Sequence, residues 1–419
     1  MKKYDVVVIG GGFAGSAAAL AAARGGAEVL LVERLNCLGG APSAMLVNPF
    51  MNYWTTDPLT HEKKLLSRGI FEELTASLRT MNAMKGMVFN PEYLKLILNR
   101  KLIDSGAEIL FNSTLTGVFC NDNMVNSVVV ANKSGIITLE GRYFIDATGD
   151  ADLAFSAGFP YMLGRDEDGL CQPMTLCFTI GNVDPDQYEL YRGKIMGIWQ
   201  EEKKKGYIKN PMDTIMVIPT MFPGIVHLNA TRVINRNPVD CFDVSKADME
   251  AREQAFELLS VLKRVVPGFE KAEILSSAVQ TGVRESRRII GEHILTGEEL
   301  KACVVFPDSV ATGNYDIDIH NPIGSGTSHY YFPDGAYYTI PYRSLIPRNA
   351  RNLLAAGRCI SATHEAQASI RIMPIVCTLG EAAGTAAALA AEDGRSVSEV
   401  DVMQLRAILK KNGAFIGES

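Results

Sequence analysis

The sequence predicts an α/β fold in which a parallel sheet covered by helices carries a second, inserted α+β domain. Three observations support this prediction. The chain opens with an apolar run, a glycine turn, an alanine-rich segment and a second apolar run over residues 4–33. Two later apolar runs, 143–149 and 351–357, end at a glycine in the same way. Between them the composition changes, and 419 residues exceed what one hydrophobic core normally supports.

The opening unit carries three glycines at the end of its first predicted strand. The first apolar run is followed directly by Gly10-x-Gly12-x-x-Gly15 and then by an alanine-rich helix. This order predicts a dinucleotide-binding turn. Gly10 allows the tight turn, Gly12 lets the backbone approach a pyrophosphate, and Gly15 lets the helix lie close on the strand. The free N–H groups at the start of the helix then face the phosphates.

Glu33 ends the second apolar run. It lies 18 residues beyond Gly15, near the position where an acid accepts hydrogen bonds from the adenosine ribose. A carboxylate there repels a ribose 2′-phosphate, which favours FAD or NAD over NADP. The alternative interpretation is a glycine-rich turn in an ordinary α/β domain.

The middle of the chain alternates between predicted strands and helices. Residues 45–100 read mostly helical, 108–115 read as a strand, and 125–139 read as a hairpin. Strand-like pieces then alternate with a helical pattern at 246–265. We therefore expect a first domain formed by residues 1–170 and 336–419, with a helical insertion at about 45–100, and a substrate or cap domain at 171–335.

The end of the chain returns to the first domain. A strand is predicted to end at Gly357, and a slim helix of small residues begins at Gly380. A last helix is expected to begin with Asp401 as its cap, because Gln404 follows three residues later, and to end at Gly413.

Composition limits the function classes. A net charge of −6 without a long Lys/Arg block argues against nucleic-acid binding. The sequence has no uninterrupted run of about 18 apolar residues, so no membrane span is predicted. Met1-Lys2-Lys3 imitates the start of a signal peptide, but Asp5 interrupts the apolar region that should follow. The eight cysteines are scattered without a Cys-x-x-Cys pair, so we expect a cytoplasmic protein with neither a disulfide nor a metal site indicated.

Four separated motifs together resemble the FAD-binding signature of flavoproteins of the glutathione-reductase and fumarate-reductase type. They are Gly10-x-Gly12-x-x-Gly15 with Glu33, Gly39-Gly40, Asp146-Ala147-Thr148-Gly149, and Ala356-Gly357-Arg358. With the segments 282–291 and 340–347, the chain is identified as a member of a bacterial family of FAD-dependent oxidoreductases. The resemblance implies a discontinuous Rossmann-like FAD-binding domain. It also implies a dehydrogenase or reductase that passes a hydride between flavin N5 and a small organic substrate.

The resemblance also implies which residues bind FAD. The start of the first helix would hold the pyrophosphate, Glu33 the ribose, Gly39 and its neighbours the flavin edge, and a late helix N-terminus the pyrimidine ring. The cofactor-binding residues expected are Gly10, Gly12, Phe13, Ala14, Gly15, Glu33, Arg34, Gly39, Gly40, Ser43, Leu115, Ala147, Thr148, Gly149, Asp150, Gly357, Arg358 and Met373.

Two stretches supply candidates for catalysis. In the first, residues 315–320, strand alternation puts Asp316, Asp318 and His320 on one face, with Tyr315 on the other. His320 could act as a general base, the three could bind a metal, or the face could simply be solvated; we expect no metal. In the second stretch, His364 could move a proton and Arg371 could bind a substrate carboxylate or carbonyl with its fork of donors.

A structural role is the alternative for both residues of the second stretch, for example through an ion pair with Glu365 or Glu381. Arg284, Arg287 and Arg288 crowd one short segment, and at least one is expected to join the domains through an ion pair.

Other flavoprotein mechanisms are disfavoured by what the sequence lacks. No cysteine pair follows Gly39-Gly40, and no second Gly-x-Gly-x-x-Gly unit follows residue 150, so a dithiol mechanism and a separate NAD(P)H domain are not expected. Gly357 is followed by Arg358, where aromatic hydroxylases carry an aspartate. A flavin monooxygenase and a non-catalytic FAD-fold binding protein remain as alternatives. The sequence identifies neither the substrate nor the electron partner.

Overall fold

A seven-stranded sheet forms the centre of the protein in the computed structural model, which describes residues 2–418. The strand order is β7-β2-β1-β10-β9-β8, and β21 pairs with the end of β10. The strands β7, β2, β1, β10 and β21 run parallel, whereas β9 and β8 continue the sheet as an antiparallel hairpin. The α/β class with a parallel sheet is therefore confirmed. The bounds are β1 Lys3–Ile9, β2 Val29–Val32, β7 Glu108–Leu110, β8 Thr114–Asn121, β9 Met124–Asn132, β10 Gly135–Asp146 and β21 Leu353–Ala355.

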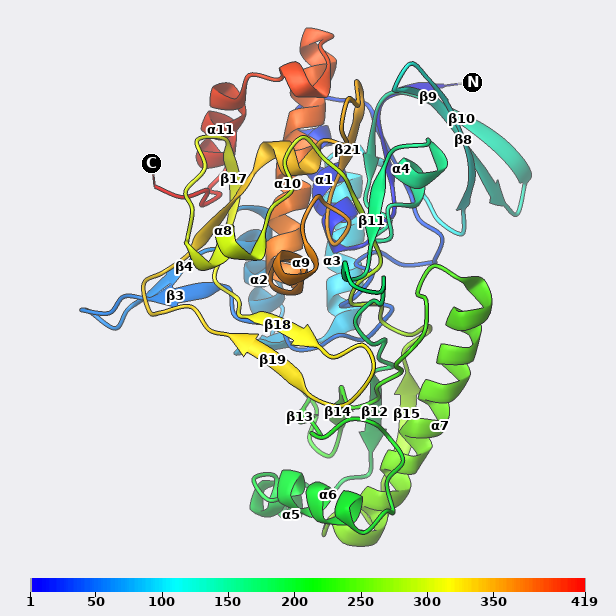
Figure 1. Ribbon diagram of the computed structural model, residues 1–419, viewed down its shortest axis with the longest axis vertical. Helices are drawn as coiled ribbons and strands as arrows, with labels where there is room; N and C mark the ends of the chain where they lie inside the picture. The colour runs from blue at the N-terminus through cyan, green and yellow to red at the C-terminus, as the bar shows by residue number, and fades with distance from the viewer. Residues whose placement is uncertain (1, 419) are drawn as a thin grey trace.

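Helices α1 (Phe13–Arg24) and α10 (Met373–Asp393) lie side by side on this sheet (Figure 1). They approach closely because both carry small residues where they cross. A Cβ added at Gly380 would lie closer than 3.0 Å to the carbonyl oxygen of Ala14, and one at Gly384 equally close to that of Ala18. This packing sets the position of one helix N-terminus relative to the other.

Among the helices of residues 2–418, α10 alone is long and apolar enough to cross a membrane. All residues of its apolar window are buried inside the protein, which is what a core helix shows. The predicted small-residue helix is longer than expected, since it begins at Met373 rather than at Gly380.

The segment 45–100 differs from the prediction of a mostly helical insertion. Helices α2 (Ile70–Thr80) and α3 (Pro91–Asp104) form, but residues 45–69 are loops with two short strands, β3 (Trp54–Thr56) and β4 (Lys63–Leu65). The aromatic side chains there build core: Phe50 stacks on Phe89 at a centroid distance of 4.2 Å. Tertiary packing therefore overrides the apparent helical pattern.

An additional domain has its own sheet and its own core. Strands β13 (Val217–Pro219), β14 (Val226–Leu228), β12 (Phe178–Gly181) and β15 (Glu273–Ser277) form an antiparallel sheet in that order. Helices α5 (Pro185–Tyr191), α6 (Ile195–Lys204) and α7 (Cys241–Val265) supply core residues to it, and Figure 1 shows this green domain below the main sheet. The buried apolar side chains between Ile289 and Ile346 belong instead to the core of the first domain, around the seven-stranded sheet. The boundaries at 170 and 335 stay a prediction.

A hairpin made of β18 (Ile317–His320) and β19 (Thr327–Tyr330) lies between the two sheets in Figure 1. Its loop reaches the additional domain, because Arg232 donates hydrogen bonds to the carbonyl oxygens of Asn321, Gly324 and Gly326. At the end of the chain, α11 (Val402–Lys411) is capped by Asp401 as predicted.

Glu381 is a buried acid on α10, only 2% exposed. Its Oε2 accepts a 2.9 Å hydrogen bond from the backbone N–H of Ile70 at the start of α2. Burial raises the pKa of Glu381 from 4.5 to about 7. The folded chain therefore binds this proton more tightly than the unfolded chain does, and the resulting stabilisation is complete below pH 4.5 and is lost as the pH rises through 7.

Glu381→Gln is expected to remove this pH dependence, since the amide oxygen can still accept the bond from Ile70. The pKa difference corresponds to about 3 kcal/mol of unfolding free energy, so the variant should be more stable than the parent above pH 7 by up to that amount. Urea denaturation at pH 5 and pH 8 measures it. Glu392→Gln, at an exposed position of the same helix, should change nothing. An equal loss of stability between the two pH values in parent and Glu381→Gln would contradict the prediction.

Candidate functional site

The glycine turn after β1 combines two tight positions with one open position. A Cβ at Gly10, where φ is +100°, would lie closer than 3.0 Å to the backbone of Ala147. One at Gly15 would lie equally close to the carbonyl oxygen of Gly10. At Gly12 the nearest atom would be 4.0 Å away. The protein's own packing thus explains two glycines, while Gly12 adjoins free space.

The pair Gly39-Gly40 lies directly against this turn. The N–H of Gly39 donates a 2.8 Å hydrogen bond to the carbonyl oxygen of Gly11. A Cβ at Gly40 would be 2.9 Å from the Cα of Gly12. Beside them the buried Oγ of Ser43 has no hydrogen-bond partner within residues 2–418. The glycine turn and the Gly39-Gly40 segment therefore lie in direct contact.

Glu33 is fixed at the end of β2 by backbone donors. Its Oε2 accepts from the N–H of Gly11 at 2.6 Å, and its Oε1 accepts from the N–H of Leu35 at 2.7 Å. The neighbouring Arg34 donates to Oε1 of Gln280 at 2.5 Å. The carboxylate is thereby held beside the glycine turn, where an adenosine ribose would meet it.

The turn after β10 is shaped by buried Asp146. Its carboxylate accepts hydrogen bonds from the hydroxyl of Thr148 at 2.7 Å and from the N–H of Ala154 at 2.8 Å. Burial raises the pKa of Asp146 to about 6. These bonds fix the turn that contains Ala147, Thr148 and Gly149.

Residues 149–150 meet Gly357 and Arg358, which are far away in the sequence. The guanidinium of Arg358 donates to Oδ1 of Asp150 at 3.0 Å. Its Nη1 is buried and has no bond to any described residue. From the other side Arg287 donates to the carbonyl oxygen of Asp150 and pairs with Asp152. The arginine-rich segment thus pairs with an acid near the turn after β10, and its role in joining two domains stays a prediction, as the domain boundaries do.

The remaining predicted cofactor residues lie around these segments. Phe13 directs its ring into the core, 5.8 Å from the ring of Phe50, so only its backbone remains for a ligand. Ala14 packs against Gly357 and Gly380. Leu115 lies on β8 opposite Val130, and Met373 is the first residue of α10.

These features fit an extended dinucleotide. The open side of Gly12 suits a pyrophosphate, and the unbonded Ser43 Oγ and Arg358 Nη1 offer polar atoms to a ligand. Helix α10 packs on α1 through Gly380 and Ala14, and its N-terminus would offer free N–H groups and a positive dipole end to the same ligand. The residues that would hold FAD are therefore those of the four motifs.

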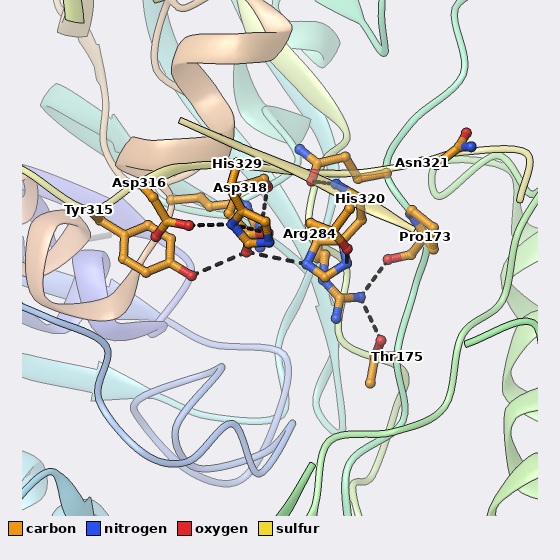
Figure 2. A network of polar contacts seen from close by, with 12 residues as sticks. Pro173, Thr175, Arg284, Tyr315, Asp316, Asp318, His320, Asn321 and His329 are labelled. Atoms are coloured by element: carbon orange, nitrogen blue, oxygen red, sulfur yellow. Dashed lines mark hydrogen bonds and ion pairs between the residues drawn. The ribbon is translucent and has the colours of Figure 1, made fainter. Parts of the chain in front are cut away.

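A network of polar side chains surrounds Asp318 (Figure 2). Asp318 Oδ2 lies 3.3 Å from His320 Nε2 and 3.3 Å from the guanidinium of Arg371, and it accepts a 3.1 Å bond from the hydroxyl of Tyr315. Tyr315 was expected on the opposite face, which is wrong because β18 begins only at Ile317. Burial acts to raise the pKa of Asp318, but the bond from His320 and the charge of Arg371 outweigh it and lower the pKa.

His320 is neutral over the physiological range. Burial, and then the charge of Arg284, lower the pKa of His320 to about 3. Its Nδ1 lies 3.4 Å from Arg232 and 3.3 Å from the hydroxyl of Thr327. An imidazole with so low a pKa is a weak general base, so this geometry favours a role in positioning Asp318.

His364 belongs to a different buried group. Its Nδ1 lies 2.8 Å from Oε1 of Glu285, which also pairs with Arg288. The prediction that His364 pairs with Glu365 or Glu381 is wrong, because its acidic partner is Glu285, which lies 79 residues away in the sequence. No feature of the local sequence indicates that partner.

The group of side chains that could bind a metal differs in one residue from the group suggested by the sequence. Ligand atoms of Asp316, Asp318 and His329 lie within 4.8 Å of one another, and His329 Nδ1 is 2.5 Å from Asp316 Oδ2. His329 therefore takes the place that the sequence suggested for His320. Oδ1 of Asp318 is buried and unbonded within the described part of the chain.

A cavity of about 530 Å³ adjoins this network. Tyr315 and Asp316 line it on the network side. The other walls are mostly apolar and come from segments far apart in the sequence; they include Met51, Trp54, Met216, Ile218 and Phe332. Of these residues only Phe332 belongs to an aromatic run of the sequence, residues 330–342, which could line a pocket. The others could not be found from the sequence, because no local pattern predicts which loops converge.

Comparison with known proteins agrees with the motifs. A family model described as FAD dependent oxidoreductase matches residues 5–409. Digeranylgeranylglycerophospholipid reductase 2 of Methanothermobacter thermautotrophicus is 29% identical over 210 residues, 46% of this chain and 51% of that protein. Thiamine thiazole synthase of Aeropyrum pernix is 32% identical over 36% of this chain and 57% of its own length. The chain thus spans about half the length of these curated relatives.

Among solved structures, a geranylgeranyl bacteriochlorophyll reductase-like protein of Thermoplasma acidophilum has a TM-score of 0.50 at 14% identity. The superposed part covers 99% of this chain and 85% of the Thermoplasma acidophilum chain, which shows a shared fold. The chain therefore belongs to the family of FAD-dependent oxidoreductases, which are enzymes that use FAD as their cofactor.

Proposed function

We propose that the protein is a dehydrogenase or reductase in which a hydride passes between flavin N5 and a small polar organic substrate beside Arg371. When bound, FAD supplies the hydride chemistry, and the protein supplies binding, orientation and electrostatics. Two curated relatives are named reductases, which supports this reaction class over oxygenation.

The observation that carries the proposal is the position of Arg371. It lies two residues before α10, whose N-terminus we place at the flavin. Its side chain is 12% exposed, and it donates to the backbone and side-chain oxygens of Asp318 at 3.0 and 3.3 Å. Its buried Nε has no partner within residues 2–418. This N–H can donate to a substrate oxygen without breaking a bond that the protein already makes.

Asp318, Tyr315 and His320 hold the fork of Arg371 in place. Asp318 accepts from it, Tyr315 donates to the same carboxylate oxygen, and neutral His320 lies on the other side. Arg371 would orient a substrate carbonyl or carboxylate, which raises the rate by restricting its geometry. We also propose a cytoplasmic enzyme without nucleic-acid or membrane partners, supported by the acidic net charge and eight free cysteines.

Arg371→Ala is expected to keep its FAD but to slow flavin reduction by substrate roughly 100-fold, as the loss of a positioning contact often does. An anaerobic screen for compounds that bleach the flavin of the holoenzyme identifies the substrate, and stopped-flow absorbance then gives the rate. Arg348→Ala, at an exposed position, serves as the control. Unchanged reduction kinetics in Arg371→Ala would remove this residue from the site, and a chain that cannot be loaded with FAD would remove the proposal.

A further inference from the structure

Three guanidinium groups gather at the Asp318 network, and they have few acids to balance them. Arg371 contacts Asp318. Within residues 2–418, Arg284 donates only to the carbonyl oxygen of Pro173 at 2.7 Å and to the hydroxyl of Thr175 at 2.5 Å. Figure 2 shows both bonds. Arg232 bonds to carbonyl oxygens of the hairpin loop and lies 3.4 Å from His320. Within the described residues, neither Arg284 nor Arg232 has a carboxylate within 4.0 Å.

The remaining titratable groups around the three arginines do not remove the imbalance. His320 carries no charge at neutral pH because burial, and then the charge of Arg284, lower its pKa. Asp316 lies farther along the hairpin and is bonded to His329. The arginines also act on one another: burial, followed by the charge of Arg371, lowers the pKa of Arg284 to about 10. Asp213 also acts on Arg232, but it pairs with Lys203 at 3.0 Å. Of the three arginines only Arg371 contacts a carboxylate, that of Asp318, and a buried surplus of like charge is unfavourable unless a counter-ion joins it.

We infer that the enzyme takes a substrate with a carboxylate group, which Arg284 and Arg371 bind while its apolar body occupies the cavity of about 530 Å³. This inference rests on the proposed function and names the substrate class for that site. The unbonded Nε of Arg371 is the donor that the bound carboxylate would satisfy. Guanidinium groups suit this task because their planar forks match a carboxylate.

The residues that line the cavity indicate the chemical nature of the rest of the substrate. Met51, Trp54, Met216 and Ile218 line it and favour an aliphatic or aromatic body. Tyr315 connects the two parts, since it lines the cavity and its hydroxyl bonds to Asp318. Neither arginine lines the cavity, and its charged lining residues, Asp316 and Asp334, are acidic. The carboxylate would therefore lie beyond Tyr315, in the network beside Arg371, with only the apolar body in the cavity.

The alternative is that Asp316, Asp318 and His329 bind a metal ion instead of the network binding an anion. The three ligand atoms are close enough. A divalent cation would add positive charge where Arg371 already lies 3.3 Å from Asp318. Like charges at such distances repel strongly in a partly buried site. The charge balance therefore favours an anion over a cation.

The inference is tested by equilibrium binding to the oxidised holoenzyme, without turnover. Three acids are compared with their neutral amides by isothermal titration: phenylacetate with phenylacetamide, benzoate with benzamide, and hexanoate with hexanamide. We expect at least one acid to bind at least tenfold more tightly than its amide. Arg371→Met and Arg284→Met should each weaken binding of that acid about tenfold and leave the amide unchanged. Arg284→Lys should restore part of the loss.

Two results would overturn the inference. One is that no acid in the panel binds more tightly than its amide. The other is that Arg371→Met lowers the affinity for FAD and leaves carboxylate binding unchanged, in which case the cations serve the cofactor. Arg371→Met decides the question even if Arg284→Met does not fold, and Arg348→Met is the control. Failure here leaves the proposed hydride transfer standing, because that is judged by flavin reduction.

Discussion

Replacing Gly12 by valine is expected to leave the chain folded and to abolish FAD binding. Gly12 has φ of −61°, a value that any residue adopts, and a Cβ there would meet no atom closer than 4.0 Å. The side chain would instead enter the space that we assign to the pyrophosphate. We expect the affinity for FAD to fall roughly 100-fold or more, equivalent to about 3 kcal/mol.

The measurement is the flavin absorbance of the purified variant together with its thermal unfolding without added FAD. Gly12→Ala, with one methyl group, should show a smaller loss of affinity. Gly15→Val provides the contrast, because its Cβ would lie closer than 3.0 Å to the carbonyl oxygen of Gly10 and should disturb folding itself. A yellow, fully loaded Gly12→Val would refute the location of the pyrophosphate.

Replacing Gly384 by valine should destabilise the protein by about 3 kcal/mol or more. A Cβ at this position would lie closer than 3.0 Å to the carbonyl oxygen of Ala18, so α10 would have to move away from α1. Since we assign the N-termini of both helices to the cofactor region, FAD should be lost along with stability. A typical domain has only about 5–15 kcal/mol of unfolding free energy, so the change is a large part of the whole.

Gly197→Ala is the matched control for this variant. Gly197 also lies within a helix, α6, but it is exposed and a Cβ there would meet nothing within 4 Å. Alanine should therefore be neutral or stabilise the chain by up to about 1 kcal/mol. Urea denaturation of both variants in the presence and absence of FAD measures the difference. If Gly384→Val unfolds at the same urea concentration as the parent, the close packing of α1 and α10 is incorrect.

Local sequence was sufficient wherever one short segment determines its own conformation. The turn at Gly10–Gly15 and the cap at Asp401 have the expected structure because glycine flexibility and side-chain capping act over a few residues. Residues 45–69 were misjudged, since apolar side chains such as Phe50 pack in a core without forming a helix. Tyr315 was misjudged because alternation holds only within a strand, and β18 begins two residues later.

The sequence by itself determined the α/β class, the family of the chain and FAD as its cofactor, because spaced glycines and a terminal acid carry that information locally. Only the tertiary structure decided which polar groups meet. It brought Arg284 and Asp318 together with Arg371, replaced His320 by His329 beside Asp316, and paired His364 with Glu285. The hydrogen bonds among these residues join positions 13 to 79 residues apart. Their partners depend on the path of the whole chain, which no periodicity within one segment specifies.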